Sequence, residues 1–139
     1  MIEFSQVPRS WGFFDVSHKE WLHACASTWG GRIAQLHYQF LTNQEIEIAN
    51  SKHLGHNYPT DVITFPYAEG QRVVAECLIG YERVEEQARA RGLPLEQEAA
   101  RVMAHGLLHC LGFNDQTAAQ KQEMRAAEDY CLVLHAKNL

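Results

Sequence analysis

The segment that most constrains the fold spans residues 102–113, because it is almost wholly apolar and yet carries two histidines. Its composition predicts a helix that is buried in the interior. Residues four positions apart lie on one face of a helix, so His105 and His109 point the same way. Any fold for this chain must cover this helix and still satisfy two imidazoles.

Two neutral imidazoles in a core need polar partners, because an unsatisfied buried polar group costs about 1–3 kcal/mol. On this helix only Cys110, a weak donor, is available to them. A single divalent metal ion satisfies both rings at once, and Asp115 supplies a third ligand beyond the helix. The pattern H-x3-H-x5-D therefore predicts a metal site formed by His105, His109 and Asp115.

Two other interpretations stay open at this point. A histidine in an apolar helix can be a hydrogen-bonded core residue. Asp115 can instead flank the capping box that Thr117 and Gln120 form, where its negative charge interacts favourably with the positive amino-terminal end of the last helix.

Composition places the chain among soluble globular proteins. Its 139 residues suit one domain, residues 1–139, with 46% apolar and 21% charged residues. No stretch approaches the roughly 18 apolar residues of a membrane span, and the amino terminus does not resemble a secretory signal. We therefore expect a cytoplasmic protein without a membrane partner. Its four scattered cysteines predict no disulfides, as in a reducing compartment.

The net charge of −5 bears on the partners of the chain. It argues against sequence-blind binding to duplex DNA, whose affinity depends on phosphate neutralisation. We expect no DNA partner, but a local basic groove, or a metal ion that attracts phosphate, stays open, and composition alone leaves nucleic-acid binding undecided.

Hydrophobic periodicity predicts nine elements in the order β-α-β-α-β-β-α-α-α. The strands are expected near residues 2–5, 34–40, 62–67 and 73–80, and the helices at 17–29, 42–54, 82–91, from Pro94 through 102–113, and 117–137. Strands joined by a helix can lie parallel, whereas the last two strands form an antiparallel hairpin. The fold class is therefore α+β, with a small mixed four-stranded sheet packed with helices and one buried, metal-bearing central helix.

Local signals mark the ends of these helices. Ser17 and Glu20 form a predicted capping box, and a second one starts at Thr42. Trp21 and Trp29 are expected in the core. Pro94 suits the first turn of the metal-bearing helix.

Two histidines and one carboxylate leave one position of a tetrahedral zinc ion open to water, which is typical of a catalytic site. Such water, with a pKa of roughly 7, can attack an ester, an amide or a phosphodiester. Zinc peptidases with an H-E-x-x-H motif carry a glutamate after the first histidine, and here that position is Gly106. A mid-helix glycine indicates a close approach by a ligand or tight helix–sheet packing, and both stay open.

Residues 105–115 resemble the signature of the YbeY family of metal-dependent endoribonucleases, H-G-x-L-H-L-x-G-Y-D-H. Residues 60–65 resemble the T-D-V-L-S-F strand of that family, and residues 75–79 stand where G-D/E-I-x-I is usual. Met124 and Glu128 match a recurring M-x-x-x-E in the last helix. The resemblance spans roughly residues 43–132.

This resemblance implies cleavage of single-stranded RNA, with maturation of the 3′ end of the small-subunit ribosomal RNA and ribosome quality control as the process. Its implied partners are ribosomal RNA and the ribosomal subunit. In that reading His105, His109 and Asp115 hold one zinc ion, and metal-bound water attacks a phosphodiester. The general base is unassigned, with Asp61 and Glu76 as candidates. The oligomeric state is left open.

Three positions depart from the family pattern. Asp115 replaces the usual third histidine, and Asn114 replaces an aspartate. Leu54 occupies the position of an arginine thought to serve the RNA groove. Nearby Lys52, His53 and His56 are the substitutes we consider for substrate binding, although residues of these types at such positions are more often ordinary loop residues.

Three alternative functions remain. One is a zinc-dependent peptidase or amide hydrolase, and another is an iron oxygenase with two histidines and one carboxylate. The third is a non-catalytic ribosome assembly factor whose metal is structural. Cleavage of single-stranded RNA that is lost in His109→Ala would set the peptidase aside, whereas binding to ribosomal subunits without RNA cleavage would favour the assembly factor.

Overall fold

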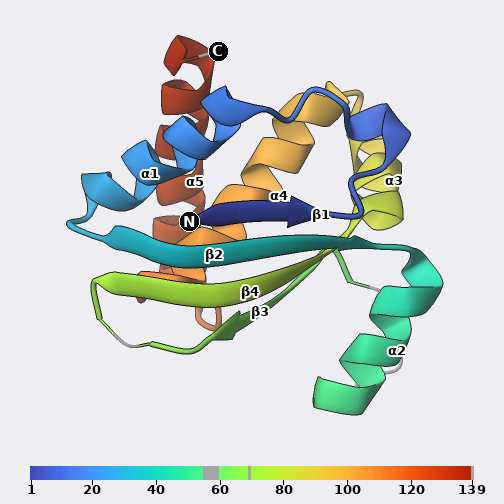
Figure 1. Ribbon diagram of the computed structural model, residues 1–139, viewed down its shortest axis with the longest axis horizontal. Helices are drawn as coiled ribbons and strands as arrows, with labels where there is room; N and C mark the ends of the chain where they lie inside the picture. Colours follow the sequence, from blue (N-terminus) through green and yellow to red (C-terminus); the bar gives the residue numbers. More distant parts are fainter. Residues whose placement is uncertain (55–59, 69, 139) are drawn as a thin grey trace.

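Four strands form one mixed sheet in the order β1-β2-β4-β3, seen in the computed structural model of Figure 1. The structure describes residues 1–54, 60–68 and 70–138. The strands are β1 (Ile2–Ser5), β2 (Arg32–Leu41), β3 (Val62–Pro66) and β4 (Arg72–Gly80). The helices are α1 (Val16–Thr28), α2 (Asn43–Leu54), α3 (Tyr81–Arg91), α4 (Leu95–Cys110) and α5 (Ala118–Asn138), with a short 3-10 helix η1 (Arg9–Trp11).

The strand pairing confirms the predicted α+β class. β1 pairs in parallel with β2, and β2 pairs in parallel with β4. β3 is antiparallel to β4, as a hairpin requires. The element order is also the predicted one, except that η1 was not expected. This turn places Trp11 fully inside the core.

The buried face of β2 differs from the prediction at its start. Leu36, Tyr38 and Phe40 are buried in strict alternation, as expected. A shift of register lies between Ile33 and Gln35, so Ile33 is buried in place of Ala34. An extra residue in a strand reverses the side-chain alternation, which sequence periodicity alone does not reveal.

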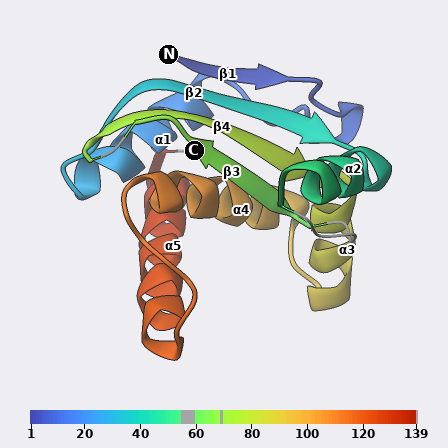
Figure 2. The same ribbon diagram turned by 90° about the horizontal axis from the view of Figure 1, so that it is seen from below.

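The helices divide unequally between the two faces of the sheet (Figure 2). On one face α4 lies over the sheet, with α1, α3 and α5 around it, and these elements enclose the main core. On the other face α2 covers only the ends of the strands, where Ile46 packs with Leu41 and Ile63. The remainder of that second face is polar and partly exposed.

Helix α4 is the central, buried helix of the fold. The hydroxyl of Tyr38 on β2 donates to the carbonyl oxygen of Met103 at 2.9 Å. A Cβ atom at Gly106 would lie only 3.0 Å from the Sγ atom of Cys77 and 3.3 Å from Oγ1 of Thr64. Glycine at this position therefore allows tight helix–sheet packing, one of the two explanations that the sequence left open.

The capping predictions were right for two helices and wrong for α1. Reciprocal bonds join Thr42 with Glu45 and Thr117 with Gln120. Helix α1, however, is capped by Asp15, which accepts from the backbone N–H of Ser17 at 2.9 Å. Pro94 is the N-cap residue of α4 and precedes its first turn.

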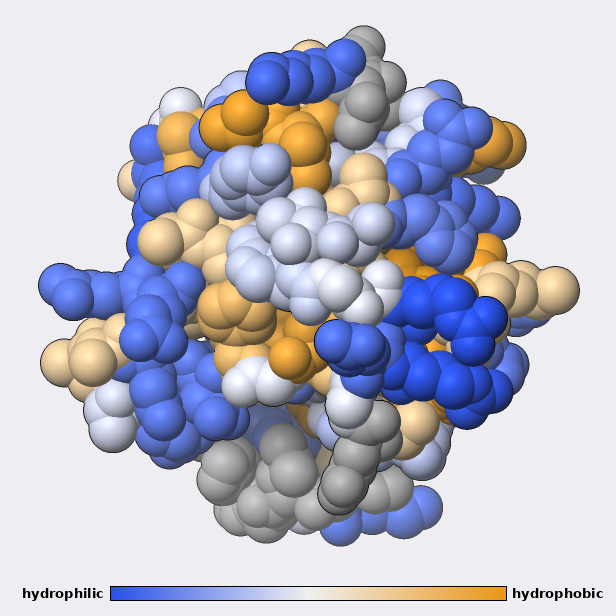
Figure 3. Space-filling model, turned by 90° about the vertical axis from the view of Figure 1, so that its left-hand side faces the viewer, coloured by the Kyte–Doolittle hydropathy of each residue, from blue (hydrophilic) through white to orange (hydrophobic). Residues whose placement is uncertain are grey.

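Burial of the aromatic residues and cysteines fits a single core. Trp21 is fully buried, whereas Trp29 is only partly covered and stands edge-on to Phe113. All four cysteines are free and buried. Figure 3 shows one face of the surface, on which hydrophobic residues emerge in separate patches among hydrophilic ones. Among the described helices, none has the length and apolar character needed to span a membrane.

Candidate metal centre

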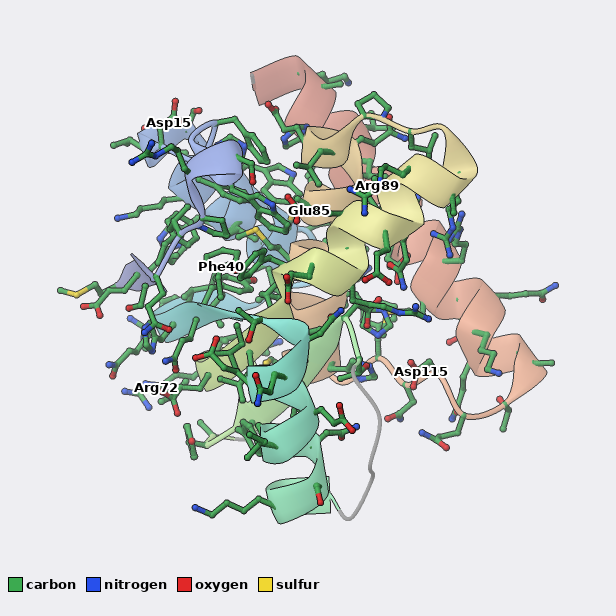
Figure 4. All side chains as sticks on the ribbon, turned by 90° about the vertical axis from the view of Figure 1, so that its right-hand side faces the viewer. Asp15, Phe40, Arg72, Glu85, Arg89 and Asp115 are labelled. Carbon is green, nitrogen blue, oxygen red and sulfur yellow. The ribbon has the colours of Figure 1, made fainter. Side chains whose placement is uncertain are left out.

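The three predicted ligands lie together in an open pocket of about 590 Å³ at the carboxyl end of α4. Strand β3 and the connection from α4 to α5 form its other walls; Figure 4 labels Asp115 on that connection. The pocket is lined by Thr60, Asp61, Val62, Ile63, Thr64, Pro66, His105, His109, Asn114, Asp115 and Gln116.

The donor atoms of the three residues form a small triangle. The Nε2 atoms of His105 and His109 are 3.0 Å apart. Oδ2 of Asp115 lies 3.3 Å from Nε2 of His105 and 3.5 Å from Nε2 of His109. All three donors therefore face one point in the pocket.

These separations fit the donor set of a divalent transition metal. Ligands bound at 2.0–2.2 Å around a tetrahedral zinc ion lie about 3.3–3.6 Å from one another. The two distances to Asp115 fall at these values, and the distance between the imidazoles is slightly shorter. Without a metal, the same atoms can share hydrogen bonds between the two rings and the carboxylate. The donor chemistry is compatible with both states.

The premise that both histidines lie in the core was wrong. The side chains of His105 and His109 are 22% and 29% exposed, respectively. Their neighbours Gly106, Leu107 and Leu108 form the buried face of α4. The imidazoles instead occupy the face that opens on the pocket. Cys110 takes no part, because its thiol donates to the carbonyl oxygen of Gly106 in its own helix.

A buried carboxylate on α5, which sequence reasoning missed, holds His105 from behind. Oε2 of Glu128 lies 2.6 Å from Nδ1 of His105. Arg101 donates to Oε1 of Glu128 at 2.9 Å and to Asp129 at 2.8 Å. A histidine that binds a metal commonly donates its other ring N–H to such a carboxylate. This bond fixes the tautomer of His105 that leaves the Nε2 lone pair in the pocket.

A signal for Glu128 was present in the sequence. Met124, Ala127 and Cys131 mark the apolar face of α5, and Glu128 lies on that same face. A glutamate among core positions is almost always paired when it is fully buried. The family pattern M-x-x-x-E marks the position of Glu128 but does not indicate its role.

The charges around the pocket shift three titratable groups. Burial lowers the pKa of His105, but the hydrogen bond and charge of Glu128, with Asp115 and Asp61, outweigh it and raise this pKa above its usual value. Burial raises the pKa of Glu128, whereas hydrogen bonds from His105 and Arg101 bring it below the usual range. Burial and the neighbouring His105 lower the pKa of His109. The two imidazoles therefore differ in the direction of their pKa shifts, and Glu128 is the main cause of the rise at His105.

The two candidate bases have different positions. Asp61 lines the pocket together with His105 and His109. Glu76 does not line it, because it lies on the opposite face of β4 from Cys77, the residue against which α4 packs. There Glu76 approaches Nδ1 of His37 at 3.3 Å and accepts from the hydroxyl of Tyr67 at 3.1 Å. Of the two candidates, only Asp61 is placed to act in this pocket.

The three residues considered for substrate binding are not brought into the pocket as far as the structure describes them. Lys52 is exposed on α2 and lines a separate groove there. His56 lies outside the described residues, and so do the side chains of His53 and Leu54. The predicted end of α2 at Gly55 also lies outside them.

A second, narrower hollow of about 160 Å³ adjoins the pocket, with Asp61 and His105 lining both. Its walls carry Arg91, Arg101 and Arg125. Arg91 pairs with Glu98 at 2.7 Å, whereas Arg125 is exposed to solvent on α5. This hollow carries as many carboxylates as arginines, and Arg125 is an exposed cation at the border of the candidate metal centre.

Known proteins resemble this chain over most of its length. The family profile described as Endoribonuclease YbeY matches residues 15–134. A protein named Endoribonuclease YbeY from Bacteroides fragilis is 36% identical over 115 residues, which cover 83% of each chain. One of the same name from Amoebophilus asiaticus is 37% identical over 122 residues, covering 86% of this chain and 83% of that protein.

Similarity extends to a solved structure. The solution structure of a Thermotoga maritima protein superposes with a TM-score of 0.72 at 25% sequence identity. The match covers 96% of this chain and 88% of the other. The arrangement of sheet and helices described above therefore occurs in an experimentally determined structure.

Proposed function

The chain belongs to the Endoribonuclease YbeY family, and from this premise we propose that it is a metal-dependent endoribonuclease that cleaves single-stranded ribosomal RNA. The observation that carries the metal-dependent part is the triangle of donors from His105, His109 and Asp115 in an open pocket. Residues 1–139 act as one catalytic domain in this proposal, and the substrate is the 3′ region of the small-subunit RNA. The enzyme then works on the ribosomal subunit in the cytoplasm, in RNA maturation and ribosome quality control.

In this proposal His105, His109 and Asp115 hold one zinc ion. A zinc ion held by three protein ligands polarises a phosphoryl oxygen and lowers the pKa of bound water. A carboxylate in place of a third neutral histidine adds negative charge at the ion, so this water is less acidic than it would be with three histidines. This difference predicts a more alkaline pH optimum than that of a three-histidine variant.

Other groups of the chain position the reaction. Glu128 accepts the Nδ1 proton of His105 and thereby orients its ring. Asp61, which lines the pocket, is the residue we assign to accept the proton of the attacking nucleophile. Arg125, an exposed cation at the adjoining hollow, is suited to contact an RNA phosphate near the cleaved bond.

Metal content is the first test of this proposal. Elemental mass spectrometry of the wild type, His109→Ala and Asp115→Ala gives the zinc bound to each purified protein. A matched control is Asn114→Ala, which alters an exposed pocket residue outside the triangle. Loss of zinc in both ligand variants, but not in the control, supports the three-ligand centre. Loss in His109→Ala alone would remove Asp115 from the ligand set and leave it as a residue that flanks the α5 cap.

An RNA cleavage assay tests the activity itself. We expect the zinc-loaded wild type to cut single-stranded RNA but not duplex RNA, and His109→Ala to be inactive. Cleavage of casein without cleavage of RNA would favour the peptidase alternative. Binding to ribosomal subunits without any cleavage, with the subunit as substrate, would favour a non-catalytic assembly factor.

A further inference from the structure

A second group of metal-type donors lies at the opposite end of α4. His18 comes from the first turn of α1, Glu96 from the first turn of α4 and His135 from the last turn of α5. These three helix ends meet at the top of Figure 1. Glu96 precedes His105 by nine residues, and this spacing corresponds to about 14 Å along the helix. In Figure 4, Asp15 marks this end and Asp115 marks the other.

The imidazole of His18 is buried and that of His135 is half-buried, and the Nε2 atoms of both are buried without hydrogen-bond partners. His18 is only 2% exposed, and neither its Nε2 atom nor that of His135 is accessible to solvent. Both atoms face the carboxylate of Glu96, with Oε2 at 3.9 Å from His18 and 3.4 Å from His135. Neither approach forms a hydrogen bond. Two buried nitrogen atoms thus converge on one carboxylate oxygen without being satisfied by it.

The surroundings of the two rings offer no better partner. Phe14 stands edge-on to His18 with ring centroids 4.7 Å apart, and Trp21 stands edge-on to His135 at 5.0 Å. The indole N–H of Trp21 is already donated to the carbonyl oxygen of Cys131 at 2.7 Å. A buried polar atom left without a partner carries its full desolvation penalty, so a bound ligand is the simplest way to satisfy both Nε2 atoms.

The far side of His18 faces both a carboxylate and a backbone donor. Oδ1 of Asp15 and the backbone nitrogen of Asp15 each lie 3.4 Å from Nδ1 of His18, so Nδ1 either donates to the carboxylate or accepts from the backbone N–H. When Nδ1 carries the proton and donates it to this carboxylate, the lone pair of Nε2 points at Glu96 and His135. Carboxylates of this kind commonly orient the histidines that bind a metal.

We propose that His18, Glu96 and His135 bind a divalent transition-metal ion of the zinc class. Two imidazoles and one carboxylate favour zinc over magnesium or calcium, which prefer oxygen ligands. The 3.4 Å separation already suits two ligands of one ion, and the 3.9 Å separation requires His18 to move by a few tenths of an ångström. A hollow of about 520 Å³ lies beside Glu96 and His135.

This second ion joins three helices and takes no part in RNA cleavage. It ties the start of α1 and the start of α4 to the end of α5, the helix that also supplies Glu128 to the catalytic pocket. An ion that binds only the folded chain raises its thermal stability. At a free zinc concentration about 100-fold above the dissociation constant, we expect the Tm to rise by about 5–10 °C.

The test compares the zinc content of the wild type with that of His135→Ala and Glu96→Gln. Both side chains are more exposed than His18, at 12% and 40%, so these variants are the better choice for retaining the fold. A control, His23→Ala, removes an exposed histidine on the same helix α1. We expect each ligand variant to bind one zinc equivalent fewer than the wild type, and the control to bind the same amount. Equal zinc content in all four proteins would overturn the proposal.

Nitrogen NMR of the wild-type histidine rings decides the question even if a variant fails to fold. Binding of zinc should move the Nε2 resonance of His18, which the catalytic pocket does not contact, and Glu96→Gln should abolish that change. An unchanged His18 resonance at saturating zinc would refute the second site. If only the second site exists, zinc shifts the His18 resonance and His109→Ala leaves the zinc content unaltered. The two proposals can therefore fail separately.

Discussion

Replacement of Glu128 by glutamine is the sharpest test of how the catalytic pocket is built. The substitution keeps the size of the side chain and an oxygen that can accept the Nδ1 proton of His105, but it removes the negative charge. We expect the fold to be retained and the affinity of the pocket for zinc to fall. The effect should pass through His105, because Glu128 is on α5 and does not line the pocket itself.

The magnitude follows from the contacts of Glu128. Its side chain is 8% exposed and approaches His105 at 2.6 Å, so solvent screens this interaction little. Loss of such an outer partner typically weakens metal binding by about 10- to 100-fold, or about 1.4–2.7 kcal/mol. The metal-free protein should lose about 1–3 kcal/mol of unfolding free energy as well. This is less than for a fully broken buried pair, because Asp129 still accepts from Arg101.

Competition with a chromophoric chelator measures the zinc affinity of the pocket, and urea unfolding measures the stability. The matched control is Asp129→Asn, which removes the other partner of Arg101. Asp129 is 58% exposed and pairs with Arg101, so we expect the zinc affinity of Asp129→Asn to stay within about threefold of wild type. Equal zinc affinity in Glu128→Gln and wild type, or an equal loss in both variants, would refute the role of Glu128. The second zinc site is excluded from the comparison by placing both changes in a His135→Ala background.

Three further predictions test packing, capping and RNA contact. Gly106→Ala should lower the free energy of unfolding in urea by about 1–2 kcal/mol, because overpacking outweighs the gain in helix propensity. In a Cys77→Ala background this cost should disappear, so additive effects of the two substitutions on the unfolding free energy would contradict the packing explanation. In thermal unfolding, Asp15→Ala should lower the unfolding free energy of the metal-free protein by about 1 kcal/mol, and Ser17→Ala by less than half of that. Equal losses in the two variants would argue against Asp15 as the cap of α1. Arg125→Ala should weaken single-stranded RNA binding in fluorescence anisotropy and reduce its salt slope by about 1 while zinc content stays unchanged, and an unaltered RNA affinity would remove Arg125 from the RNA path.

Local signals predicted most of the fold, because each depends on a few neighbouring residues. The reciprocal bonds of Thr42 and Thr117 need only residues three positions away. The same reasoning failed at α1, where Asp15 and Ser17 are both good capping residues and sequence alone does not rank them. The register shift after Ile33 depends on pairing with β4, about forty residues later in the chain. Such a contact leaves no trace in the alternation of β2 itself.

The candidate site divides in the same way. His105, His109 and Asp115 are close in sequence, so helix geometry and one turn suffice to bring them together. Glu128 reaches His105 only through the packing of α5 on α4, which spacing does not encode. The choice between Asp61 and Glu76, by contrast, was within reach. Since Cys77 is buried against α4, its neighbour Glu76 must point to the opposite face of the strand.

Helix α4 serves both the core and the pocket because its two faces have different neighbours. Leu107 and Leu108 fix the helix against the rest of the core, while His105 and His109 emerge beside the edge strand β3. Gly112, with φ of 103°, then reverses the chain in a conformation that L-residues rarely adopt. This turn returns Asp115 to the histidines, so the donor triangle is held by packed elements before any ion arrives. Changes at the two leucines should therefore damage stability and zinc binding together, whereas a change at Asp115 should damage zinc binding alone.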